Sequence, residues 1–257
     1  MIELVFSWLT LLAIAAALIA AITRDARATF GLLAFAALSA CAAAISRTVM
    51  VGHLPKFGVF ETSLGTAAVV TLHAAWVGRR PERILPASIA AAVGGGLLIH
   101  GLFFPTSRLP LTISEQSIWL DLHVIAAWLT AAAFALCAGG AIWIFSRGGK
   151  AAESLTTRSL QVGFVFSSFL ILAGAYYGHR LHGRAFSLDP VELLAVISWL
   201  TTASVLHLRA YRGLSGRRLA GLALTAVVVL LLWYRVTPHL TPSSTFHIID
   251  VEDRLHG

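Results

Sequence analysis

Residues 219–233 read LAGLALTAVVVLLLW, a stretch without a single charged side chain. Its apolar residues follow one another instead of alternating with polar ones, whereas a strand of an outer-membrane barrel alternates over about 10 residues. Comparable apolar runs recur along the whole chain of 257 residues, and a helix needs about 20 such residues to cross a bilayer. We therefore expect an all-α integral membrane protein.

The composition agrees with this fold class. Of all residues 58% are hydrophobic and 12% are charged, against about 45–50% and about 25% in soluble domains, which excludes a water-soluble fold. We expect one polytopic membrane domain over residues 1–240 and an outer tail over 241–257. No basic segment precedes the first apolar run, so we expect it to be retained and not cleaved as a signal peptide. The eight predicted spans are 2–23, 29–46, 61–78, 84–104, 119–145, 160–178, 191–208 and 218–236.

The distribution of Lys and Arg predicts the orientation. If the N-terminus lies outside, twelve of the 19 basic residues fall on inner loops, most densely at 79–83 and 217–218. Because basic residues concentrate on the cytoplasmic side, both termini are predicted to lie on the outer, periplasmic side. Short cytoplasmic turns facing anionic lipid then explain much of the net charge of +7, so no nucleic-acid partner is expected.

Histidines gather on the predicted outer side of the membrane. Neutral imidazole is a good axial ligand for haem iron, and two helices can present one ligand each to opposite faces of a porphyrin. His123 opens the fifth span and His239 closes the eighth, so both lie at the same depth and could share one haem. The alternative is that each is an interfacial histidine solvated by lipid headgroups. Eight of the ten histidines are outward: His53, His100, His123, His179, His182, His239, His247 and His256.

Two further features concern residues within or beside the spans. His73 falls inside the third span, where an ionisable side chain suggests a haem site or substrate passage, or a neutral histidine bonded to a neighbouring helix. Glu61, Asp189 and Glu192 stand at predicted helix starts, where carboxylates favour the helix dipole and cap the first turn. The chain contains no Cys-x-x-Cys-His motif for covalent haem.

Several short motifs follow one another in a fixed order between residues 50 and 240. Together they resemble the cytochrome c assembly proteins, a haem-handling group that includes CcsA and CcmC. The set is more specific than any one of its members. It comprises Gly52-His53-Leu54-Pro55 with Glu61, then His73, Leu122-His123-Val124, Gly174-Ala175, Asp189-Pro190-Val191-Glu192, Trp199, Leu206-His207-Leu208-Arg209 and finally His239.

The resemblance implies a haem-binding protein of cytochrome c biogenesis in the bacterial inner (cytoplasmic) membrane. It implies that His123 and His239 are the axial ligands of haem b at the outer face, and that His73 forms a transmembrane haem site. A partner membrane protein of the assembly system and an apocytochrome c, or another outer redox protein, would be its partners. The outer loop would supply further haem contacts: Arg180, His182, Arg184, Phe186 and Asp189.

This outer loop departs from the family pattern Trp-Gly-x-x-Trp-x-Trp-Asp-Pro. Residues 182–190 read HGRAFSLDP, so all three tryptophans are absent, although Phe186 can stack on a porphyrin and Arg180 and Arg184 can meet its propionates. Two alternatives to haem delivery therefore stay open. One is a membrane haem subunit that passes quinol electrons to an outer redox partner, and the other is a HemX-like regulatory relative without haem transfer. Whether the chain is itself a haem lyase is also open.

Overall fold

The computed structural model describes residues 2–104, 106, 115–186 and 190–240, without the side chains of 233–240. The described residues are almost entirely helical and contain no strand, so the all-α expectation is confirmed. Their helices are α1 (Ile2–Ile22), α2 (Ala26–Val51), α3 (Gly58–Gly78), the short 3₁₀ helix η1 (Pro81–Arg83), α4 (Ile84–Gly101), α5 (Ile118–Ser146), α6 (Lys150–His182), α7 (Pro190–Arg212) and α8 (Gly216–Leu240).

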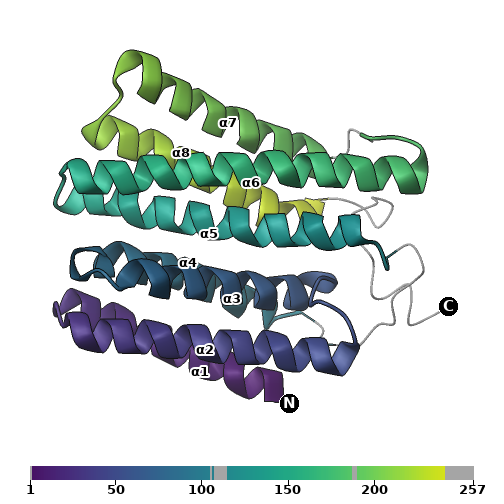
Figure 1. Ribbon diagram of the computed structural model, residues 1–257, viewed down its shortest axis with the longest axis horizontal. Coiled ribbons are helices and arrows are strands. Elements are labelled where there is room, and N and C mark those ends of the chain that lie inside the picture. Colours follow the sequence, from purple (N-terminus) through teal and green to yellow (C-terminus); the bar gives the residue numbers. More distant parts are fainter. Residues whose placement is uncertain (1, 105, 107–114, 187–189, 241–257) are drawn as a thin grey trace.

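The helices run up and down as one antiparallel bundle, so that α1 begins and α8 ends at the same end (Figure 1). Helices α1 to α4 pack mainly on one another, and helices α5 to α8 form a second group of the same kind. The two groups meet where α5 packs against α3 and α4. Helix α5 therefore touches both halves of the molecule, and a side chain on it is positioned by both.

Six helical segments of the described chain are long and apolar enough to cross a membrane: Ile2–Ile22, Ala26–Val51, Pro81–Gly101, Ile118–Ser146, Lys150–His182 and Pro190–Arg212. Helix α3 is not among them, because polar residues such as Glu61, Ser63, Thr66 and Thr71 interrupt it. These four side chains are buried, so neighbouring helices and not lipid surround them. The chain is thus a multi-pass membrane protein, while eight spans and outer termini stay predictions.

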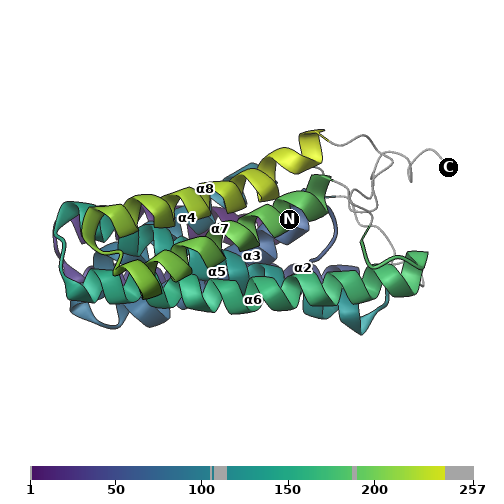
Figure 2. The same cartoon turned by 90° about the horizontal axis from the view of Figure 1, so that it is seen from above.

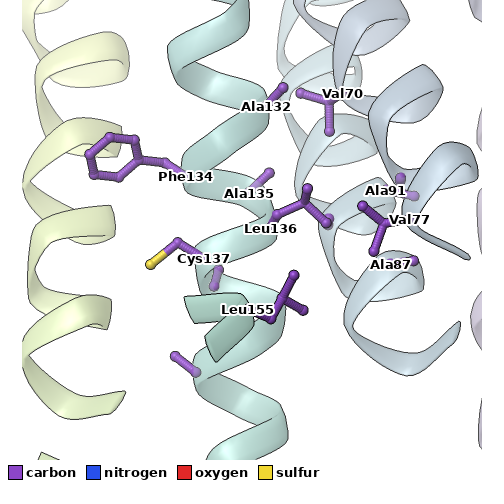
Figure 3. Close-up of a cluster of buried hydrophobic side chains, with 14 of the residues drawn as sticks. Val70, Val77, Ala87, Ala91, Ala132, Phe134, Ala135, Leu136, Cys137 and Leu155 are labelled. Carbon is purple, nitrogen blue, oxygen red and sulfur yellow. The ribbon is translucent and has the colours of Figure 1, made fainter. Parts of the chain in front are cut away.

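Small residues on α5 bring it close to its neighbours, as expected for glycines in membrane helices. A methyl group at Gly139 would clash with the backbone of Pro86 in α4, and one at Gly140 would lie 2.6 Å from Oγ1 of Thr156 in α6. Figure 3 shows Leu136 of α5 pointing toward the α3 and α4 side, while Phe134 and Cys137 point away from it. The central helix is therefore packed on two sides along its length.

Helix α6 is longer than the span predicted over 160–178, because it runs from Lys150 to His182. Its 33 residues correspond to about 50 Å of helix, compared with about 30 Å of hydrocarbon. Its last turns project beyond the neighbouring helices in both views (Figures 1 and 2). Gly183 then ends the helix at φ 70°, a left-handed conformation that glycine adopts easily, and its N–H donates to the carbonyl of His179.

Candidate functional site at the histidine end of the bundle

Most of the described histidines lie at one end of the bundle. This histidine end is where α1, α3, α5 and α7 begin and where α2, α4, α6 and α8 end. His207 lies near the opposite end of α7, and His73 lies in the second half of α3. The histidines that the sequence assigned to the outer side therefore share one end, which holds the described members His53, His100, His123, His179 and His182.

His123 stands in the second turn of α5, turned toward α6. Its Nδ1 lies 2.9 Å from the backbone carbonyl oxygen of Leu170, so Nδ1–H donates to that oxygen. The ring lies directly against Gly174, where a methyl group would come within 2.8 Å of Nδ1. A glycine one turn beyond Leu170 thus makes room for the ring, and the carbonyl fixes its tautomer. In this tautomer Nε2 carries the lone pair.

An aromatic pair lies beside His123. Trp119 of α5 and Tyr176 of α6 have ring centroids 4.4 Å apart, and both rings are partly exposed. Trp119 precedes His123 by four residues and therefore lies on the same face of α5. The sequence alone does not connect Tyr176 with His123, because the two residues come from different helices.

The second expected ligand, His239, lies in the last turn of α8, and its side chain is outside the described residues. Helix α8 packs against α5, so the two helices that carry His123 and His239 are neighbours. That the two imidazoles face each other stays a prediction. Asp189 also lies outside the described residues.

The remaining loop residues lie beyond the level of His123. Arg180 and His182 are exposed in the last turn of α6, and Arg184 and Phe186 are exposed after it. Because His182 follows Gly174 by eight residues, it lies about 12 Å further along the helix axis. The carbonyl of Arg184 turns back toward Gly178, where a methyl group would lie 3.3 Å from it. This short loop thus folds over the end of α6.

His73, the proposed transmembrane ligand, is half-buried on α3. Its ring lies 6.1 Å from that of Trp76, which is exposed on the outside of the bundle. Because His73 lies in the second half of α3 and His123 lies near the start of α5, the two histidines are at different levels of the bundle. Its role as a haem ligand stays a prediction.

Two ion pairs at the histidine end were not foreseen. Arg47 of α2 is 1% exposed and donates to Glu61 of α3, with Nη2 and Oε1 2.8 Å apart. Its Nη1 also donates to the carbonyl of Thr106 and lies 4.0 Å from a carboxylate oxygen of Glu3 in α1. Glu61 in turn accepts the N–H of Phe57, the residue before α3. The capping role expected for Glu61 is present, together with a buried ion pair.

The second pair joins the α2–α3 loop to α5. Lys56 is 7% exposed, and its Nζ lies 2.5 Å from Oδ1 of Asp121 and 3.0 Å from the carbonyl oxygen of Glu115. The spans predicted over 29–46 and 61–78 leave both Arg47 and Lys56 in the loop between them. For Arg47 the difference is the prolongation of α2 to Val51, which takes this residue into the bundle, where a charge must be paired.

Long apolar helices surrounding a few buried polar groups define the chain as a multi-pass helical membrane protein. A family model described as cytochrome C assembly protein matches residues 1–239. The chain therefore belongs to the cytochrome c assembly protein family, as the ordered motifs predicted.

The relatives of the chain include proteins named CcsA. The cytochrome c biogenesis protein CcsA of Synechococcus sp. is 27% identical over 245 residues, which cover 79% of this chain and 81% of that protein. The CcsA of Parasynechococcus marenigrum is 27% identical over 227 residues, covering 71% and 74%. A solved structure, the cytochrome c heme lyase CcmF, matches 95% of this chain with a TM-score of 0.68 and 19% identity. This chain spans 46% of the length of CcmF, and at that identity the likeness shows the fold alone.

Proposed function

We propose that the chain binds haem b at the histidine end, with His123 and His239 as axial ligands, and presents it for attachment to an apocytochrome c. The observation that carries the proposal is the hydrogen bond from Nδ1 of His123 to the backbone carbonyl of Leu170. A histidine whose Nδ1–H is held by a backbone carbonyl presents Nε2 in a fixed direction, and metal-ligating histidines have this second contact almost always.

The residues around His123 suit a porphyrin. Trp119 and Tyr176 offer partly exposed aromatic faces on the side of α5 that carries the histidine, and aromatic rings stack on flat apolar ligands. Packing of α8 against α5 supports His239 as the second ligand. The absence of a Cys-x-x-Cys-His motif from the sequence favours non-covalent haem b. When bound, the haem supplies the iron and the vinyl groups that react with cysteines of the acceptor.

The loop after α6 would complete the site at the outer surface. Arg180 and Arg184 are exposed, and each can form a charge-assisted contact with a haem propionate. Phe186, His182 and Asp189 are the other proposed haem contacts, and His73 would receive haem within the membrane. This arrangement suits a protein that works with a partner membrane protein and hands haem to an apocytochrome in the periplasm.

The proposal is tested on the full chain purified in detergent. We expect wild-type protein to copurify with haem that gives a low-spin, six-coordinate absorption spectrum. His123→Ala is expected to lower the affinity for added haem by more than roughly tenfold, because loss of even a second contact of a ligand histidine has an effect of that size. His239→Ala is expected to lower the haem content as well. A chain that binds no haem, or whose haem spectrum ignores both substitutions, would refute the proposal.

Transfer is tested separately from binding. Co-expression with an apocytochrome c in a host without its own assembly system should give covalent haem on the acceptor, detected by haem staining after denaturing electrophoresis, once the matching partner protein is supplied. Haem that binds tightly, cycles between oxidation states and never reaches the acceptor would support the electron-transfer alternative. Absence of haem would support the regulatory one.

A further inference from the structure

A second histidine at the same end has the same backbone arrangement as His123. His53 lies in the loop between α2 and α3, and its Nδ1 is 2.7 Å from the carbonyl oxygen of Leu54. A carbonyl oxygen only accepts, so a contact this short requires the proton on Nδ1, and the neutral ring then has its lone pair on Nε2. The loop backbone has thus fixed the tautomer of His53.

The Nε2 atom of His53 is buried and, within the described part of the chain, has no hydrogen-bond partner. Most buried polar side-chain atoms have one, and an exception calls for an explanation such as a bound ligand, an ordered water or strain. The edge of the ring packs against Phe57, with centroids 5.6 Å apart and planes at 79°. The imidazole is therefore held by the Leu54 carbonyl and the Phe57 ring, in partly apolar surroundings, with an acceptor nitrogen that no described residue satisfies.

The chemistry of the surroundings limits what could satisfy it. The described residues contain no group of three or more His, Cys, Asp or Glu side chains that could hold a bare metal ion. A haem iron needs only one or two ligands from the protein, because the porphyrin supplies the other four. One fixed imidazole beside an aromatic ring is sufficient for such a ligand and insufficient for a free cation.

The loop that carries His53 is fastened to the helix that carries His123. Lys56 follows His53 by three residues and is bonded to Asp121, which precedes His123 by two. Three residues of extended chain reach at most about 11 Å from His53 to Lys56, and the ion pair then attaches this part of the loop to the first turn of α5. The carbonyl of Glu115, before α5, accepts from the same ammonium group and adds a second attachment.

We infer that His53 is a third imidazole ligand of the haem site, which takes the iron in place of His239. This inference rests on the proposed function. A chain that hands haem on must release an axial bond, and the exchange breaks one iron–nitrogen bond while it forms another, with no change in oxidation state. His123 would hold the iron throughout, while His53 and His239 alternate on the opposite face.

The test compares His239→Ala with His239→Ala/His53→Ala by absorption spectroscopy of haem-loaded protein. In His239→Ala the haem that remains is expected to be six-coordinate and low-spin, because His53 takes the vacant position. In His239→Ala/His53→Ala it is expected to be five-coordinate and high-spin, and added imidazole should restore the low-spin spectrum. The matched control is His239→Ala/His100→Ala, which removes another histidine of the same end and should retain the low-spin spectrum of His239→Ala.

Two outcomes would overturn the inference. One is a His239→Ala protein that is already high-spin, and the other is a double variant that stays low-spin. Either result leaves haem binding by wild-type protein intact, so it is distinguishable from failure of the proposed function, in which wild type binds no haem. Should His53→Ala not fold, as judged by gel filtration in detergent, His53→Gln retains a polar side chain of similar size without an imidazole and is subject to the same two outcomes.

Discussion

At the scale of single residues, Gly174 decides whether His123 can take its position. Alanine there would place a methyl group 2.8 Å from Nδ1 and 2.9 Å from Cε1 of His123, closer than a side chain tolerates, so the ring must move away from the carbonyl of Leu170. Loss of this second contact is expected to weaken haem affinity about 10–100-fold. The measurement is a haem titration of the Gly174→Ala protein followed by absorption.

Gly96 of α4 provides the control for this prediction. A methyl group at that position meets no atom within 4 Å, so Gly96→Ala should leave haem affinity unchanged. It should also raise stability by about 0.5–1 kcal/mol, because alanine is the better residue in a helix interior. If Gly174→Ala behaved like Gly96→Ala in the haem titration, the packing of His123 on α6 would have no part in haem binding.

The same residues mark what sequence alone can and cannot predict. Motif order singled out His123 as a candidate ligand and predicted it near the start of a helix, where α5 has it, because local sequence determines where a helix begins. It could not connect His123 with Leu170, Gly174 or Tyr176, since those contacts depend on how two helices are rotated against each other. The ligand pairing of His123 with His239 likewise depends on how α5 and α8 are rotated against each other.

At the scale of helices, apolar length predicted where the elements lie better than where they end. The second span was expected to end at residue 46, whereas α2 continues to Val51, and this difference turns Arg47 from a loop charge into a buried one. Hydropathy measures which part of a helix suits lipid. It does not report helix turns that continue into polar residues, as α6 does at both ends.

Arg47 and Glu61 fasten α2 to α3, and their pairing can be tested by a double-mutant cycle. Arg47→Leu leaves the buried carboxylate of Glu61 without its charged partner and is expected to cost about 3–5 kcal/mol of stability. Glu61→Leu should be similarly damaging. The double variant Arg47→Leu/Glu61→Leu should recover part of the loss, because neither Arg47 nor Glu61 is left buried without the other. Thermal or denaturant unfolding in detergent gives the three values, and strictly additive losses would mean that the two groups do not interact.

At the scale of the whole molecule, two groups of four helices meet on α5, and the candidate ligands are divided between them. His53 belongs to the first group through the α2–α3 loop, while His123 and His239 belong to the second. The Lys56–Asp121 bridge crosses between the groups at the histidine end. A haem bound there would therefore lie between two packing units, which is a position where a change in their contact can alter ligation.

Delivery of haem to a periplasmic apocytochrome c requires the histidine end to face the periplasm. This orientation can be measured with introduced cysteines. In a background of Cys41→Ala/Cys137→Ala, Thr106→Cys lies at the histidine end and Lys150→Cys at the opposite end, and both positions are exposed. The concentration of Arg and Lys on the loops of the opposite end predicts that it is cytoplasmic. A membrane-impermeant maleimide added to intact cells should label Thr106→Cys at once and Lys150→Cys only after lysis. Labelling in the reverse order would place the histidine end in the cytoplasm, where an apocytochrome c in the periplasm could not receive haem from it.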